Sequence, residues 1–185
     1  MHTLNRILQA GKLVPALEQA LHARYNVHRL TDESDPAAFL AEHGAQFDAV
    51  VTSAAIGLSA QHLAALPSVK VISSFGVGLD KVPVEEAKAR SIAVGYTPDV
   101  LNDCVADTAF ALLLDVARRT AEADRFVRAG QWARLGSNSF GLGRKVSGAR
   151  MGVVGMGRIG QTIARRSLGF DMEVRYHTRR PVAGV

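Results

Sequence analysis

One stretch of the sequence combines a short apolar run, three spaced glycines and a helical pattern. Met151–Val154 has the composition of a buried parallel strand, and residues 161–168 are expected to form a helix. Between them, Gly155 would allow a tight turn, Gly157 would let a pyrophosphate approach the backbone, and Gly160 would let the helix pack close to the sheet. Free N–H groups at the helix start would face the phosphates, so the pattern predicts a dinucleotide site.

The strand that follows this helix indicates which dinucleotide is bound. NAD-binding proteins usually carry an acidic residue about 20 positions past the glycines, where it accepts a hydrogen bond from the ribose 2′-hydroxyl. Asp171 and Glu173 come too early for this role, at the far end of the strand. The residues at the strand tip are His177, Thr178, Arg179 and Arg180. A hydroxyl and guanidinium groups suit a 2′-phosphate, so the sequence favours NADP(H); the alternative is a solvated basic turn before Pro181.

The composition is that of an ordinary globular protein. The 185 residues are 48% hydrophobic and 21% charged, with a single cysteine that excludes an internal disulfide and fits a reducing compartment. No apolar run is long enough to cross a bilayer, and no secretory signal pattern is present at the N-terminus. We therefore expect a cytoplasmic protein with no membrane partner.

Positive charge is concentrated in the second half of the chain. From Arg118 onward there are 14 Lys and Arg against 4 Asp and Glu, whereas the preceding residues hold 8 against 13. Such a basic half raises the possibility of nucleic-acid binding. The arginines occur singly or in pairs, with few aromatic residues and no recognisable nucleic-acid module. We therefore expect no nucleic-acid partner, because cofactor phosphates and solvated helix faces account for these charges.

Residues 1–99 alternate short apolar runs with helical patterns. The expected strands are 4–9, 27–30, 48–52, 69–73 and 92–94, and the expected helices are 15–25, a helix opening near 35–36, 59–66 and 83–90. This alternation predicts an α/β domain with a flavodoxin-like parallel sheet, whose ligands should lie at the carboxyl ends of the strands. At such an end, Gly76 and Gly78 can present backbone N–H groups to a carboxylate. The alternative there is a plain glycine turn.

Residues 100–185 are expected to form an incomplete Rossmann domain. A long helix at 101–119 is apolar nearly all round, so we expect it to be mostly buried and to link the two domains. A second helix at 121–129 is followed by Trp132, which is more often a packing anchor than a ligand contact. A loop rich in glycine and serine, residues 136–148, then leads to the glycine motif.

From about Val50 onward, the chain resembles the D-isomer-specific 2-hydroxyacid dehydrogenases, and most closely their NADPH-preferring glyoxylate, hydroxypyruvate and hydroxyphenylpyruvate reductases. The stretches that carry the resemblance are Ser74-Phe-Gly-Val-Gly-Leu-Asp-Lys81, Thr97-Pro-Asp-Val-Leu101, Val105-Ala-Asp107, Ala117-Arg-Arg119, Gly130-Gln-Trp132, Gly155-Met-Gly-Arg-Ile-Gly160 and Tyr176-His-Thr-Arg-Arg-Pro181. The resemblance implies a substrate domain interrupted by a Rossmann domain, with the active site in the cleft between them.

The resemblance also implies roles for individual residues. The amides of Val77 and Gly78 should hold the carboxylate of a small 2-keto acid. Val105 and Thr108 should lie near the nicotinamide. The expected cofactor contacts also include Gly155, Met156, Gly157, Arg158, Ile159, Gly160, His177, Thr178, Arg179 and Arg180. Members of the family are usually dimers, here through about residues 121–143, and Trp132 of one subunit could reach the active site of the other.

Members of the family are much longer than this chain. The resemblance places their keto-polarising Arg, their Glu and their proton-donating His in segments that would follow Val185, so we expect the chain to be the N-terminal part of an NADPH-dependent 2-keto-acid reductase and inactive alone. We assign no metal site and no catalytic residue within it. The alternative is a non-catalytic dinucleotide-binding or dimerising module on the same scaffold, and the sequence does not indicate which keto acid is used.

Overall fold

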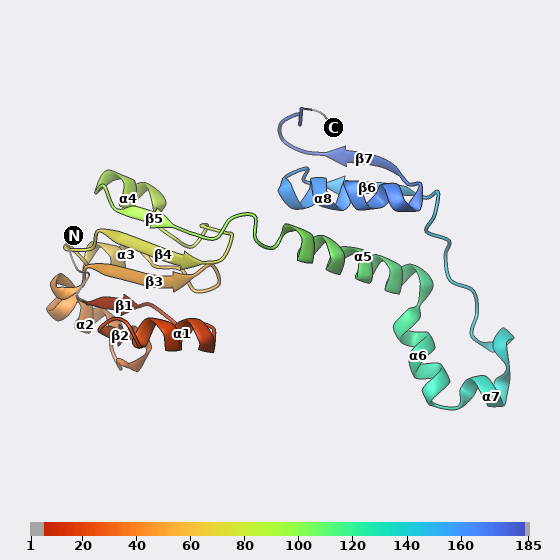
Figure 1. Cartoon of the computed structure of the whole chain (residues 1–185), viewed down its shortest axis with the longest axis horizontal. Helices are drawn as coiled ribbons and strands as arrows, with labels where there is room; N and C mark the ends of the chain where they lie inside the picture. Colours follow the sequence, from red (N-terminus) through yellow and green to blue (C-terminus); the bar gives the residue numbers. More distant parts are fainter. Residues whose placement is uncertain (1–5, 184–185) are drawn as a thin grey trace. The chain divides into compact units, whose positions relative to one another are not determined.

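The structure, a computed structural model, describes residues 6–183 and divides into two compact units that meet in sequence at Val100 and Leu101 (Figure 1). Each unit is an α/β structure with its own parallel sheet and its own core. No helix among residues 6–183 is long and apolar enough to span a membrane.

The first unit contains five short parallel strands that alternate with helices. Its strands are β1 (Ile7–Gln9), β2 (Val27–Arg29), β3 (Ala49–Ser53), β4 (Val71–Phe75) and β5 (Ala93–Gly95), and its helices are α1 (Pro15–His22), α2 (Pro36–His43), α3 (Ala60–Ala64) and α4 (Val84–Ala89), with short 3₁₀ turns at Leu30–Asp32 and Gly44–Gln46. The strand order β2-β1-β3-β4-β5 is that of flavodoxin-like sheets, which confirms the predicted fold class. The part of the first expected strand that precedes residue 6 lies outside the described residues.

The core of the first unit is built on one face of this sheet. Strand pairing places Leu8 beside Val50 and Val50 beside Ile72, so that three fully buried aliphatic side chains form a row across the sheet. Leu40 of α2 and Leu63 of α3 pack in the same buried cluster, as does α4. Each of these helices connects strands in the same direction across the sheet. Because such crossovers are right-handed, they place the helices on the same face.

Two helices of this unit begin where the sequence places capping residues. The Asp35 carboxylate accepts hydrogen bonds from the amides of Ala37 and Ala38 at 3.1 and 3.0 Å, and Pro36 occupies the first helical position. The Ser59 hydroxyl accepts from the amide of His62 at 3.0 Å. Both caps fix where the connections end, and therefore where the loops at the carboxyl ends of the strands can lie.

The second unit combines four α-helices and two 3₁₀ turns with a two-stranded parallel sheet. Its elements are α5 (Asn102–Arg118), α6 (Thr120–Arg128), α7 (Gln131–Leu135), a 3₁₀ turn (Ser137–Ser139), β6 (Arg150–Val154), α8 (Arg158–Ser167), a 3₁₀ turn (Leu168–Phe170) and β7 (Glu173–His177). The β6–α8–β7 order is the expected strand, helix and strand around the glycine motif. Its core joins Phe110 of α5 to Phe170, with ring centroids 5.3 Å apart, and to Met151 and Val153 of β6.

Two expectations for this unit are wrong. The long helix α5 is not mostly buried, since Leu112 and Val116 are 62% and 81% exposed, and only Ala106 and Phe110 among its residues are buried. Its apolar residues surround the helix, but α8 and β6 cover one side of it. Trp132 lies on a short helix, α7, that the sequence pattern did not predict, and it is 49% exposed rather than a packing anchor within this chain.

The closest backbone approach in the second unit is between α8 and the end of β6. A Cβ added to Gly160 would overlap the carbonyl oxygen of Gly155 and would lie 3.4 Å from a methyl group of Val153. The backbone oxygen cannot move aside without opening the turn. Gly160 is therefore required for α8 to pack against the strand that precedes it, as its place in the motif predicts.

We predict that Gly160→Ala lowers the free energy of unfolding of this unit by about 1–3 kcal/mol, because overpacking displaces α8 from β6. The matched control is Gly169→Ala, since a Cβ at Gly169 would meet no atom within 4 Å. Urea unfolding followed by circular dichroism measures both variants. Equal stability of the two would contradict the packing role of Gly160.

Candidate functional site

The glycine loop after β6 forms an open turn at the start of α8. Gly155 has a φ of +95°, in the region that favours glycine, and its amide donates to the carbonyl of His177 at 2.8 Å. Gly157 is exposed, and a Cβ on it would meet nothing within 4 Å. No side chain caps α8, which begins directly after this glycine. The loop thus presents a helix N-terminus and an unobstructed backbone, which is the arrangement that binds phosphate groups.

Side chains of the loop residues point in different directions. Met156 is 2% exposed and belongs to the hydrophobic core, so only its backbone is available to a cofactor. Its carbonyl oxygen accepts a hydrogen bond from the Gln161 side chain at 3.2 Å, which fixes the loop against the first turn of α8. Arg158 is exposed and Ile159 is half-buried. Sequence reasoning did not identify Gln161 as a support of this loop.

The tip of β7 lies beside the same loop, because β6 and β7 are parallel and Val154 pairs with His177. Arg179 and Arg180 are exposed, and neither makes an ion pair or hydrogen bond within residues 6–183. Glu173 lies at the opposite end of β7 and bonds Arg175 at 2.8 Å. The structure therefore brings basic groups, and no carboxylate of β7, to the position where a cofactor ribose would lie. Thr178 is half-buried between His177 and these arginines.

In the first unit, the loop after β4 is held in an unusual backbone conformation. Gly76 has a φ of +140°, and a Cβ on it would lie 2.5 Å from that of Ala54. Its amide donates to the Thr97 hydroxyl at 3.0 Å, and its carbonyl accepts from the Thr97 amide at 3.0 Å. The next two amides, of Val77 and Gly78, donate no hydrogen bond within the described part of the chain. They remain available to an anion such as a carboxylate.

The loop after β3 supports this one. The amide of Leu58 donates to the carbonyl of Lys81 at 2.9 Å, and the Lys81 ammonium donates to the carbonyl of Ala55 at 2.7 Å. Gly57, with a φ of +79°, lies against the Lys81 backbone, where no side chain would fit. These supports link residues far apart in sequence. Only the presence of glycine and Thr97 near strand ends could have indicated them.

The remaining predicted contacts, Val105 and Thr108, lie on α5 of the second unit and are exposed. The Thr108 hydroxyl donates to the carbonyl of Cys104 at 2.9 Å, so its oxygen lone pairs stay available. No group of three side chains that could hold a metal ion occurs among residues 6–183.

The two units thus define an α/β protein with a flavodoxin-like sheet followed by a glycine-loop βαβ unit. Residues 7–179 match the family described as D-isomer specific 2-hydroxyacid dehydrogenase, catalytic domain, and the chain belongs to this family. The family is one of NAD(P)-dependent oxidoreductases.

Several curated proteins are similar in sequence to this chain. Glyoxylate/hydroxypyruvate reductase A HPR2 of Arabidopsis thaliana is 40% identical over 163 residues, which cover 88% of this chain and 51% of the relative. Hydroxyphenylpyruvate reductase of Plectranthus scutellarioides is 41% identical, with the same coverage. The chain spans about half the length of the curated relatives it matches.

Solved structures of the family resemble the whole chain. A 2-hydroxyacid dehydrogenase from Ketogulonicigenium vulgare Y25 has a TM-score of 0.89 and 39% identity, over 98% of this chain and 57% of that one. An NADPH-dependent glyoxylate/hydroxypyruvate reductase from Sinorhizobium meliloti, in complex with NADP and malonate, has a TM-score of 0.81 and 36% identity, over 99% and 56% of the two chains.

We predict that Gly157→Ala separates binding from stability. Its thermal midpoint should stay within about 2 °C of the wild-type value, because the added methyl group meets no protein atom. Its affinity for NADPH should fall at least about tenfold, because the methyl group occupies the space a pyrophosphate would need. Thermal melting and NADPH fluorescence titration measure the two effects. Unchanged NADPH affinity would show that the cofactor does not approach this backbone.

Proposed function

We propose that this chain supplies the cofactor and carboxylate sites of an enzyme that reduces a small 2-keto acid, of the glyoxylate or hydroxypyruvate type, to the D-2-hydroxy acid with NADPH. The observation that carries the proposal is the presence of two anion-binding loops on one chain. One is formed by the unpartnered amides of Val77 and Gly78, and the other by the glycine loop before α8. The names of the relatives support the same substrate class.

The described residues fit NADP(H) in three respects. The backbone at Gly157 is open, α8 begins without a side-chain cap, and Arg179 and Arg180 are exposed without an acidic partner. A 2′-phosphate could bind two guanidinium groups there, whereas a ribose hydroxyl would find no acceptor carboxylate at this end of β7. We therefore propose that NADPH is preferred over NADH.

In this proposal, the chain binds and orients both reactants. When bound, the reduced nicotinamide supplies the hydride that the carbonyl carbon of the keto acid receives. Val77 and Gly78 would hold the substrate carboxylate through backbone N–H groups, and Val105 and Thr108 would contact the nicotinamide end.

A non-catalytic dinucleotide-binding module is the second candidate, and it shares the glycine loop. It would have no use for the Gly76 loop, whose strained backbone and free amides suit a carboxylate. Malonate, a dicarboxylate present in the structure of a relative, can serve as the probe of this loop. NADPH binding without binding of malonate or of a 2-keto acid would favour the module.

We predict that the double variant Arg179→Ala/Arg180→Ala weakens NADPH binding about tenfold or more and changes NADH binding less than twofold, because charge-assisted bonds to the 2′-phosphate are lost. Arg175→Ala is the control, since Arg175 lies on β7, the strand that precedes Arg179 and Arg180, but bonds Glu173. Fluorescence titration with both cofactors measures the ratio of affinities. A parallel loss of NADPH and NADH affinity would contradict 2′-phosphate recognition.

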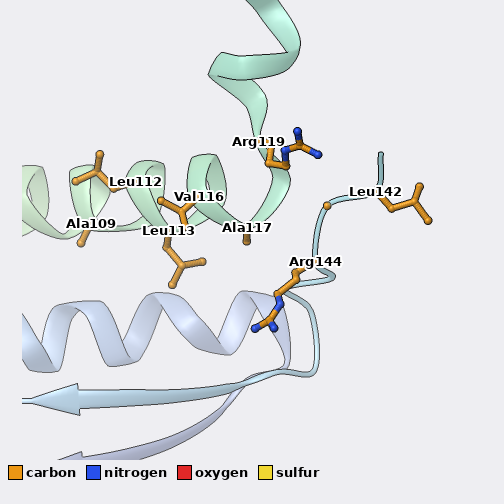
Figure 2. Close-up of a pocket in the computed structure, with 9 residues that line it drawn as sticks. Ala109, Leu112, Leu113, Val116, Ala117, Arg119, Leu142 and Arg144 are labelled. Atoms are coloured by element: carbon orange, nitrogen blue, oxygen red, sulfur yellow. The ribbon is translucent and has the colours of Figure 1, made fainter. Parts of the chain in front are cut away.

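We also propose a homodimer through about residues 121–143, together with the adjoining face of α5. An open apolar groove of about 810 Å³ lies between α5 and the loop at residues 142–144 (Figure 2). Val116 is 81% exposed and Leu142 is 99% exposed on this groove. Apolar side chains exposed together in this way are characteristic of an interface, and a second copy of the chain is the occupant we propose.

We predict that Leu142→Asp shifts the protein from dimer to monomer in sedimentation velocity at micromolar concentration, because a carboxylate at the interface loses its water without gaining a partner. Leu168→Asp is the control, since Leu168 is also an exposed leucine, at 71%, but lies outside the proposed surface. Dimers that persist in Leu142→Asp, or that dissociate equally in the control, would contradict this interface.

A further inference from the structure

Arg166, near the end of α8, connects this helix to the first two turns of α5. Its Nε donates to Asp107 Oδ1 at 2.7 Å, and its Nη2 donates to Asp103 Oδ1 at 3.1 Å and to the Asp103 carbonyl at 3.3 Å. The third nitrogen, Nη1, lies 3.5 Å from the carbonyl of Thr162 on its own helix. One planar guanidinium thus fixes two helices through bonds in different directions, which a lysine could not reproduce.

The surroundings keep this group charged and ordered. The Arg166 side chain is 28% exposed, less than the two carboxylates that it contacts. Burial lowers the pKa of Arg166, but the bonds from Asp103 and Asp107 outweigh burial and raise the pKa above its ordinary value. The guanidinium is therefore cationic at every working pH.

The geometry of α5 gives this contact a consequence for the opposite side of the helix. Asp103 and Asp107 are four residues apart and share one face, which is held against α8. At about 100° per residue, Val105 lies about 180° and Thr108 about 120° around the helix from the middle of this face, and both are exposed. Fixing the acidic face therefore sets the rotation of α5 about its axis and the direction in which Val105 and Thr108 point.

The same guanidinium is connected to the glycine loop through α8. Thr162 is buried, and its hydroxyl donates to the carbonyl of Arg158 at 2.9 Å, at the first residue of the helix. The helix that carries Arg166 is thus the helix whose first turn would bind the pyrophosphate.

We propose that Arg166 is a positioning residue of the dinucleotide site, which holds the Val105–Thr108 face of α5 in register with the glycine loop so that one cofactor can contact both. This role rests on the proposed function, and it extends it to a residue outside the binding loops. The two partner residues, Asp107 and Asp103, lie 59 and 63 residues from Arg166 in sequence, so the motif spacing alone does not indicate the contact.

The test compares two ligands that share the adenosine end. NADPH should reach both α5 and the glycine loop, whereas adenosine 2′,5′-bisphosphate lacks the nicotinamide and can contact only the adenosine side. For Arg166→Gln, we expect NADPH affinity to fall about three- to tenfold and adenosine 2′,5′-bisphosphate affinity to change less than twofold. Arg165→Gln is the control, because Arg165 is the neighbouring exposed arginine and bonds only Thr162. Asp107→Asn should reproduce part of the loss.

Hydrogen exchange provides a second measurement that needs no cofactor. The amides of residues 104–108 should exchange faster in Arg166→Gln than in the wild type, while those of β6 and β7 keep their rates. Unchanged exchange, or equal losses of affinity for both ligands, would overturn the positioning role. A wild-type protein that binds neither ligand would instead overturn the proposed function, and the role of Arg166 with it.

Discussion

The second unit depends on a single close approach, that of the first turn of α8 to the carbonyl of Gly155. Because Gly160 has no side chain, the helix can begin directly above the end of β6, with its unpaired amides beside the turn. Moving the helix outward by the width of a methyl group would withdraw those amides from any ligand at the turn. It would also separate Met156 and Val153 from the α8 side chains that complete the core. The same contact thus packs the helix and keeps its first amides exposed at the turn, where the proposed function needs them.

Much of the fold could be predicted because its determinants are local. Alternating apolar and helical patterns identified every strand of the first sheet within a few residues, and Asp35 and Ser59 marked two helix starts by their capping chemistry. The flavodoxin-like order follows from strand and helix alternation with right-handed crossovers. The glycine motif could also be predicted, because each of its glycines meets a backbone constraint and does not depend on a distant partner.

What the sequence did not reveal depends on partners far along the chain. The apolar composition of α5 indicated burial, but composition does not say how many sides of a helix are covered, and Val116 remains exposed. Helix α7 is too short to show a periodic pattern, so Trp132 was misinterpreted as a packing anchor. Hydrogen bonds join Thr97 to Gly76 and Lys81 to Ala55, which are 21 and 26 residues apart. Their spacing in the sequence does not predict these bonds.

Charge is distributed so that the glycine loop keeps an uncompensated positive field. Residues 101–185 hold 14 Lys and Arg against 7 Asp and Glu, whereas residues 1–100 hold 8 against 10. Most of those seven acidic groups are bonded away from the loop, to Arg119, Arg128, Arg166 and Arg175. Arg179 and Arg180 are left to attract a polyanion. The Gly76 loop belongs to the first unit, which carries an excess of acidic residues. Its Val77 and Gly78 present neutral backbone amides instead, which suit a ligand with a single carboxylate. In the proposed function, these two kinds of anion site, one cationic and one made of backbone dipoles, would distinguish a phosphorylated cofactor from a small acid.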